Sequence, residues 1–281
     1  MQRNDSSRTV VVAGGTDGMG RATAVARIER GDTVVVVGRN AEKGARLTEL
    51  AERLGATDRF AFVQADLSSI AAVRKVIRYV SEAHPVVDAL VLTANRQNLK
   101  RAESAEGIES TLSLYYLSRY LLGHGFAEQF DAAADPVIIN VAGPGIKAGS
   151  VAWDDLQLRG RYTTMRAQLQ AGRANDLLAV AFAENPSSRA KYVLYHPGFT
   201  RTDAINQFNQ PLRALVKAYA KVGAKSVADS AAPMIRWIEN PPAERLTVDD
   251  RGKPVDLNLK TFDQGDASRL VGVTEELLKG R

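Results

Sequence analysis

Six short apolar runs alternate with helical stretches along the first two-thirds of the chain. Continuous Val, Ile and Leu runs are typical of strands covered on both faces, and helices between them make the strands parallel. The alternation therefore predicts one α/β domain: a doubly wound parallel sheet of about seven strands with helices on both faces. The strands are expected at residues 9–14, 33–38, 60–66, 88–95, 136–143 and 191–198, and the helices at 20–30, 41–55, 69–83, 109–126 and 165–184.

A glycine-rich stretch, AGGTDGMG at residues 13–20, stands between the first strand and the first helix. Glycines at such spacing allow a sharp turn and a close approach of backbone to a pyrophosphate, while the helix N-terminus supplies amide donors. Surface turns also collect glycine, but this position in a strand–turn–helix unit predicts dinucleotide binding. The expected phosphate contacts are Gly14, Gly15, Thr16, Gly18, Met19 and Gly20.

The end of the second strand indicates which dinucleotide is preferred. An NAD site usually has an acid here for the ribose 2′-hydroxyl, whereas this chain has Gly38-Arg39-Asn40. A guanidinium binds a 2′-phosphate through a fork of donors, so NADP is expected over NAD. The alternative is that Arg39 only begins a solvated helix. Asp66, which ends the third strand, is expected to accept from the adenine amino group, to cap the next helix, or to do both.

Composition excludes several other classes of protein. There is no cysteine, and the three histidines are scattered, so no metal site is expected. No apolar run approaches the roughly 20 residues that span a bilayer, and the first residues lack the core of a signal peptide. A net charge of +5 is mild and accompanies no nucleic-acid module. We expect a cytoplasmic protein that binds a small-molecule substrate and neither membrane nor nucleic acid.

The domain plan is simple. Residues 1–8 are polar and are expected to form a disordered tail, and residues 9–281 one dinucleotide-binding domain. Residues 199–226 follow the carboxyl end of the sixth strand, where sheets of this type bind ligands. They are therefore expected to form a loop or helix on the substrate side.

The spacing of these elements resembles the short-chain dehydrogenase/reductase family over nearly the whole chain, which implies a Rossmann-type fold. AGGTDGMG is similar to the family's Thr-Gly-x-x-x-Gly-x-Gly with Ala13 in place of threonine, and GRN at 38–40 resembles NADP-preferring members. WDDLQL at 153–158 resembles the retinol dehydrogenase-like branch. Through ADL at 65–67, TAN at 93–95 and HPGFTRTD at 196–203, the resemblance implies cofactor contacts by Asp66, Leu67, Ala94, Pro197, Gly198 and Thr200.

The resemblance fails at the positions that carry the family's chemistry. Members use a serine, a tyrosine acid, a lysine one helical turn later and an asparagine in the fourth helix. Matching INVAG and ANDLLAVAF to the family places Gly143 at the serine, Leu169 at the tyrosine and Arg173 at the lysine. Tyr115 then falls at the asparagine. Losing the acid and the oxyanion donor should cripple ordinary ketone reduction, since the acid alone contributes roughly 10²–10⁴ in rate.

Two residues are candidates to replace the missing groups. Arg173 keeps a positive charge for the ribose or the nicotinamide side, although arginine cannot relay a proton at neutral pH. Tyr115 is a candidate acid whose pKa would fall beside Arg173. The alternative for Tyr115 is packing within the aromatic stripe of helix 109–126. Tyr162, which precedes Arg166 by four residues, is expected to be a packing residue.

Two classes of function remain open. One is an NADP(H)-dependent oxidoreductase with a rebuilt site that acts on a small organic molecule. The other is a redox-inactive relative whose bound dinucleotide is structural, and which catalyses isomerisation, cyclisation or dehydration or serves as a binding protein. The apolar helices 109–126 and 165–184 are also candidates to form a homodimer interface.

Overall fold

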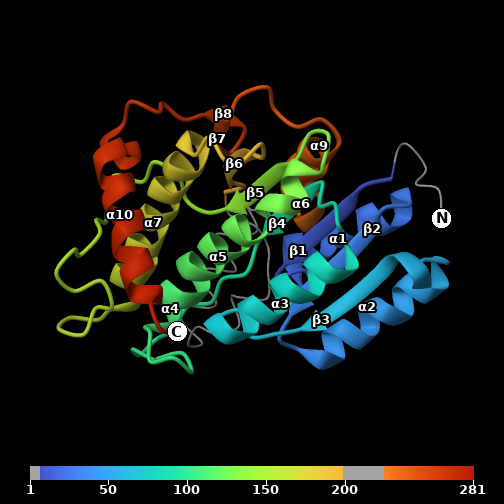
Figure 1. Cartoon of the computed structure of the whole chain (residues 1–281), viewed down its shortest axis with the longest axis horizontal. Coiled ribbons are helices and arrows are strands. Elements are labelled where there is room, and N and C mark those ends of the chain that lie inside the picture. The colour runs from blue at the N-terminus through green and yellow to red at the C-terminus, as the bar shows by residue number, and fades with distance from the viewer. Residues whose placement is uncertain (1–6, 199–224) are drawn as a thin grey trace.

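The computed structural model describes residues 7–198 and 225–281. Within them a single sheet has the strand order β3-β2-β1-β4-β5-β6-β7-β8, and the order reverses between β1 and β4 (Figure 1). Strands β1 to β7 pair in parallel and the short β8 pairs antiparallel with β7. The strands are β1 Thr9–Ala13, β2 Thr33–Gly38, β3 Phe60–Gln64, β4 Ala89–Leu92, β5 Val137–Val141, β6 Lys191–His196, β7 Leu246–Asp250 and β8 Lys253–Pro254.

Helices cover both faces of the sheet because successive strand residues point to opposite sides. In β1, Val10 and Val12 pack in a cluster with α1, α2 and α9, whereas Val11 and Ala13 pack in a second cluster with α3, α5, α7 and α10. The described helices are α1 Gly18–Arg30, α2 Ala41–Arg53, α3 Ile70–Ala83, α4 Ser110–Leu112, α5 Ser118–Gly125, α6 Ala127–Asp131, α7 Thr164–Glu184, α9 Val227–Glu239 and α10 Gln264–Leu278. A π-helical turn, Ser113–Leu117, joins α4 to α5.

Side-chain caps fix the starts of the helices that face the predicted site. The Asp17 side chain accepts from the Gly18 amide at the start of α1, and Asn40 accepts from the Lys43 amide at the start of α2. Ser69 caps α3 and Thr163 caps α7 in the same way. Each cap satisfies an amide that the helix itself leaves unpaired, so these four boundaries are set by local sequence.

The predicted fold class is confirmed, with differences at the ends of the chain. Beyond the six strands assigned by position, β7 and β8 complete the sheet. Arg8 does not belong to a disordered tail, because its amide donates to Asp32 Oδ1 at 2.9 Å and its guanidinium to the Glu239 carbonyl at 2.9 Å. Residues 199–224 lie outside the described part of the chain, and with them Thr200 and most of the predicted substrate-side segment.

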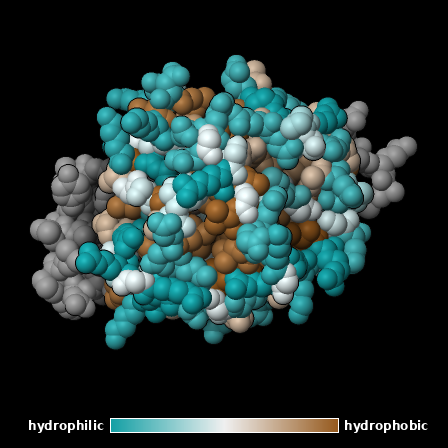
Figure 2. All heavy atoms as spheres, turned by 60° about the vertical axis from the view of Figure 1, so that its left-hand side comes forward, coloured by the Kyte–Doolittle hydropathy of each residue, from teal (hydrophilic) through white to brown (hydrophobic). Residues whose placement is uncertain are grey.

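The C-terminal helix α10 packs along α7, and it is joined to the π-helical turn by a 2.6 Å hydrogen bond between the hydroxyls of Tyr116 and Thr274. It therefore takes up part of the helix surface that the predicted homodimer would use, and the homodimer remains a prediction. Figure 2 brings this side of the molecule forward and shows apolar side chains gathered at its centre within a hydrophilic surround.

Two classes of feature are absent from the described residues. None of the helices that the structure describes has the length and hydropathy needed to cross a bilayer. Likewise, residues 7–198 and 225–281 contain no group of three or more His, Asp or Glu side chains placed to hold a metal ion.

Candidate functional site

The loop between β1 and α1 has no room for a side chain at Gly14 or Gly20. A Cβ on Gly14 would lie 2.6 Å from the Ala94 amide nitrogen, and one on Gly20 would lie 2.5 Å from the Gly14 carbonyl oxygen. Gly14 also has a φ of +89° and Gly18 one of +52°, which L side chains rarely adopt. The loop thus packs directly against the residues that follow β4, at the point where the strand order reverses and where such sheets bind ligands.

On the side of β2 and β3, where the sequence predicts the adenosine half, there is an open hollow lined by Arg39, Asn40, Gln64, Ala65 and Asp66. The Arg39 side chain is exposed, and its guanidinium makes no hydrogen bond or ion pair with any described residue. Its carbonyl accepts from Gln64 Nε2 at 3.2 Å, which joins the ends of β2 and β3. Asn40 caps α2 through its Oδ1, an acceptor, so the cap does not use its Nδ2 donors. Arg39 is the cation of this hollow, and its guanidinium donors are free for a phosphate.

Asp66 keeps one carboxylate oxygen available. Its Oδ1 accepts from the Ser68 amide at 2.9 Å and from the Ser68 hydroxyl at 2.7 Å, while Ser69, not Asp66, caps α3. Partial burial raises the pKa of Asp66, but the Ser68 hydrogen bonds and the nearby Arg96 and Arg39 outweigh it and hold the pKa below its usual value. An ionised carboxylate at the end of β3 is a suitable acceptor for an exocyclic amine. Leu67 beside it is buried in the core.

On the other side of the switch point, the face of α7 that meets the end of β4 carries Gln168 and Gly172. Gln168 Oε1 accepts from Asn95 Nδ2 at 3.1 Å, and Gln168 Nε2 donates to the Arg96 carbonyl at 3.0 Å. One turn later, a Cβ on Gly172 would meet no atom within 4 Å. This face of α7 therefore presents the side-chain amide of Gln168 and free space beside Gly172.

Leu169 and Arg173, the predicted replacements of the tyrosine and lysine, lie on a different face of α7. Leu169 packs against Gly149, where an added Cβ would lie 2.7 Å from the Leu169 Cβ. Arg173 donates to the carbonyls of Ile146 at 2.8 Å and Gly149 at 3.2 Å. Successive side chains of an α-helix point about 100° apart. Shifting the alignment of α7 with the family's helix by one residue therefore moves the assigned tyrosine and lysine positions to another face of the helix. Arg173 holds the β5–α7 connection, which leaves its ribose or nicotinamide role without geometric support.

Tyr115 is buried in the π-helical turn, with 8% of its surface exposed. Burial raises the pKa of its phenol, Asp176 raises it further, and Arg119 opposes the shift. The expected lowering of this pKa by Arg173 is therefore wrong: the nearby guanidinium belongs to Arg119, which lies 4.5 Å from the ring centroid of Tyr115. Tyr115 packs as the aromatic alternative predicted, and its catalytic role stays a prediction without support from its pKa.

A buried polar network lies beneath the carboxyl ends of β4 and β5. Arg119 donates to Asn140 Oδ1, to the Val141 carbonyl at 2.8 Å and to the Ala94 carbonyl at 3.0 Å. Asn140 Nδ2 donates in turn to Asn175 Oδ1 at 2.8 Å, and Asn175 Nδ2 to the Tyr115 carbonyl at 2.7 Å. Asn140 and Asn175 are fully buried and Arg119 is 2% exposed.

Asp176 is buried within α7. Its side chain is 2% exposed, its Oδ2 accepts from Arg173 Nη1 at 3.1 Å and from the Gly145 amide at 3.2 Å, and its Oδ1 is buried without a partner. Burial outweighs the attraction of Arg173 and the Gly145 hydrogen bond, and it raises the pKa of Asp176 to about 8.

This pKa predicts a loss of stability as pH rises. The folded state holds the proton up to a pKa of about 8, whereas the unfolded carboxyl releases it near 3.8. Folding thus becomes less favourable between these values, as linkage requires for a raised acid pKa. Asp176→Asn, which cannot ionise, should gain stability relative to the wild type by roughly 1 kcal/mol or more between pH 5 and pH 8. Urea unfolding at both pH values measures this; a constant difference between the two proteins would contradict it.

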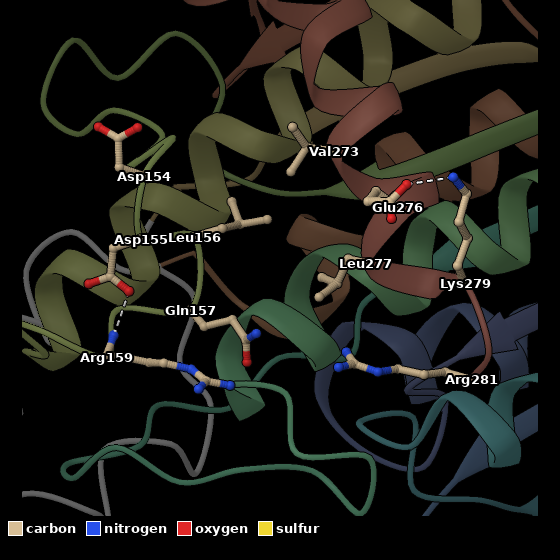
Figure 3. Close-up of a pocket in the computed structure, with 10 residues that line it drawn as sticks. All are labelled: Asp154, Asp155, Leu156, Gln157, Arg159, Val273, Glu276, Leu277, Lys279 and Arg281. Atoms are coloured by element: carbon tan, nitrogen blue, oxygen red, sulfur yellow. Dashed lines mark hydrogen bonds and ion pairs between the residues drawn. The ribbon is translucent and has the colours of Figure 1, made fainter.

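A second pocket lies away from this edge. It is formed between the 154–159 segment and the C-terminal part of α10 (Figure 3), and its lining includes Asp154, Leu156, Val273 and Leu277. Acidic and basic side chains are mixed around it, and Glu276 is already paired with Lys279 at 2.5 Å. It shares no residue with the dinucleotide site.

Sequence reasoning missed Arg119, Gln168 and Gly172. For Arg119 a signal was present, since it is the single charge within the apolar segment 114–122. A lone charge in such a segment is buried only with dedicated partners, which makes it a candidate for a special role. In the loop after β6, Gly198 has a φ of +85° and Pro197 is buried, and their cofactor contacts stay predictions.

A glycine loop at the switch point, a hollow with free Arg39 beside it and a parallel sheet together define a dinucleotide-binding α/β protein. The short chain dehydrogenase family matches residues 8–153, which is more than half of the chain. A Streptomyces sp. (strain C5) protein provisionally named daunorubicin C-13 ketoreductase DnrU is 30% identical over 94% of this chain and 90% of its own length. The chain belongs to the short-chain dehydrogenase/reductase family.

Other relatives agree with this assignment. Retinol dehydrogenase 13 of Mus musculus is 27% identical over 70% of this chain, and the match spans 59% of that protein, under two thirds of its length. A structure of an uncharacterised protein from Mycobacterium paratuberculosis superposes with a TM-score of 0.73 at 22% identity, covering 97% of this chain and 93% of that one. A short-chain dehydrogenase from Burkholderia cenocepacia in complex with NADP has a TM-score of 0.66 at 20% identity, covering 89% and 99%. These two structures share the fold.

Proposed function

We propose that the protein is an NADP(H)-binding oxidoreductase that acts on a small apolar molecule through a site without the usual serine, tyrosine and lysine. The observation that carries the binding part is the crowding at Gly14 and Gly20 in the loop after β1, where backbone atoms leave no room for a Cβ. In such loops this close approach lets amides and a helix N-terminus reach a pyrophosphate. The residues present therefore fit a dinucleotide.

The proposed preference for NADP(H) over NAD(H) rests on Arg39. Its guanidinium is exposed and uncommitted at the end of β2, whereas Lys43 in the first turn of α2 is paired with Asp17. Asp66 Oδ2 is available to the adenine. The bound cofactor would supply hydride chemistry, and the described residues of this chain supply binding and orientation.

The reacting half of the site favours substrates that need little proton transfer. Gln168 and Gly172 offer neither an acid nor a cation, and a Cβ at Gly143 would lie 3.0 Å from Ile146 Cδ1, so an apolar side chain covers the place of the serine. Exposed apolar residues sit around this edge: Leu99 after β4, Ile146 after β5 and Met165 at the start of α7. An apolar iminium ion or conjugated alkene is the substrate class that suits such a site, and a large apolar ketone or alcohol is the class that the relatives' names point to.

The second candidate is a non-redox role, and the opening at Gly172 favours it. If Gln168 rather than Leu169 stands at the family's acid, Gly172 rather than Arg173 stands where the family has the lysine that activates it, and that position is then bare. A protein of this kind would hold its dinucleotide as a structural group while it catalyses an isomerisation, cyclisation or dehydration, or binds a partner.

One experiment separates the two. The protein is mixed with NADPH and a panel of apolar ketones, iminium ions and conjugated alkenes, and absorbance at 340 nm and product formation are followed together. The proposal expects NADPH to be consumed in a one-to-one ratio with a reduced product from an iminium or alkene. Product formed with NADPH unconsumed supports the non-redox role and contradicts the oxidoreductase.

A further inference from the structure

Arg119 is a buried cation that forms no ion pair with any described residue. It is 2% exposed, and its partners among the described residues are two backbone carbonyls, a side-chain amide and the ring of Tyr115. Although burial lowers its pKa, arginine stays protonated in proteins. Burying a charge among neutral partners is costly, so we expect the charge of Arg119 to have a function.

The position of Arg119 in the fold indicates what this function is. The carbonyls that it binds belong to Ala94, just after β4, and to Val141, the last residue of β5. A dinucleotide at the switch point has its adenosine half over β2 and β3, so its other half extends over the ends of β4 and β5. Arg119 therefore lies in the floor under the nicotinamide half.

We infer that Arg119 makes this site selective for the reduced dinucleotide. The inference rests on the proposed function, because it concerns the redox form of the same cofactor. The oxidised nicotinamide ring carries one positive charge and the reduced ring carries none. A fixed guanidinium below the ring repels the first and leaves the second unaffected, and low polarity at a buried position strengthens the repulsion.

The expected size follows from Coulomb repulsion between two unit charges. At an effective dielectric constant of about 20 and a separation of about 10 Å, the dissociation constant for NADP⁺ is on the order of ten- to thirtyfold above that for NADPH. A tenfold ratio raises the midpoint potential of the bound couple by about 30 mV, because the reduced form is the one stabilised. The protein would then retain NADPH in preference to NADP⁺.

Equilibrium binding tests this without any substrate. Dissociation constants for NADPH, NADP⁺ and 2′-phospho-ADP-ribose, which lacks the nicotinamide, are measured by calorimetry for the wild type, Arg119→Met and Arg119→Lys. The wild type should favour NADPH over NADP⁺ by at least tenfold. The ratio should fall at least threefold in Arg119→Met and persist in Arg119→Lys, while 2′-phospho-ADP-ribose binds all three proteins alike.

The outcomes are distinguishable. Equal binding of NADPH and NADP⁺ by the wild type overturns the inference even if neither variant folds. An unchanged ratio in Arg119→Met, with normal binding of 2′-phospho-ADP-ribose, also overturns it. Failure of the wild type to bind any of the three ligands overturns the proposed function instead.

Discussion

Gly14→Ala is expected to abolish dinucleotide binding and to lower the free energy of unfolding by more than about 3 kcal/mol. The new Cβ would lie 2.6 Å from the Ala94 amide nitrogen and 2.8 Å from its Cα, and backbone atoms of two strand ends cannot move apart cheaply. The φ of +89° adds strain of its own. Chemical denaturation and NADPH calorimetry measure the two effects.

Gly31→Ala is the matched control for this prediction. Gly31 caps α1 with a φ of +99°, but a Cβ there would meet no atom within 4 Å. This substitution should cost about 1 kcal/mol from the backbone conformation alone and should leave NADPH binding unchanged. If both variants lose the same stability and both bind NADPH, the crowding at Gly14 has no role in the site.

Introducing the family's serine, tyrosine and lysine, with the last two on the face of α7 that carries Gln168, should enable the protein to reduce ordinary ketones. The triple variant Gly143→Ser, Gln168→Tyr and Gly172→Lys places an oxyanion donor, an acid and a cation around the open edge. The lysine enters free space, and the serine displaces only the flexible end of Ile146. NADPH-dependent reduction of an aromatic ketone should rise roughly 10²–10⁴-fold, the usual contribution of a general acid. Initial rates at 340 nm report it.

The control is the same design moved by one residue: Gly143→Ser with Leu169→Tyr and Arg173→Lys. These side chains would face the β5–α7 connection, where Leu169 touches Gly149 and Arg173 binds carbonyls. No gain in ketone reduction is expected. A gain in this variant and none in the first would show that Leu169 and Arg173 occupy the catalytic face after all.

The sequence was most informative where local chemistry decides the structure. The valine runs of β1 and β2 allow hardly any other element, and the glycines at 14 and 20 have one physical explanation between a strand and a helix. Arg39 could be placed at the end of β2 because strand ends are marked by the change to polar residues. For this reason the fold and the position of Arg39 at the end of β2 followed from the sequence.

The side-chain contacts at the ends of β4 and β5 did not follow, because they depend on helix rotation and on residues distant in sequence. Leu169 and Gln168 are neighbours in sequence but lie on faces about 100° apart, and a match to ANDLLAVAF does not resolve one residue. The burial of Arg119 and Asp176 depends on carbonyls and amides from β4, β5 and the connection after β5. No local pattern in the sequence encodes those partners.

Calorimetric titration with NADPH and NADH tests the central claim most directly, using the wild type, Arg39→Ala and, as a control, Arg53→Ala at the far end of α2. We predict that the wild type binds NADPH with a dissociation constant on the order of micromolar. Arg39→Ala should weaken NADPH at least tenfold through loss of the phosphate contact and leave NADH unchanged, and Arg53→Ala should change neither. If the wild type binds neither nucleotide, the dinucleotide site assigned here does not exist.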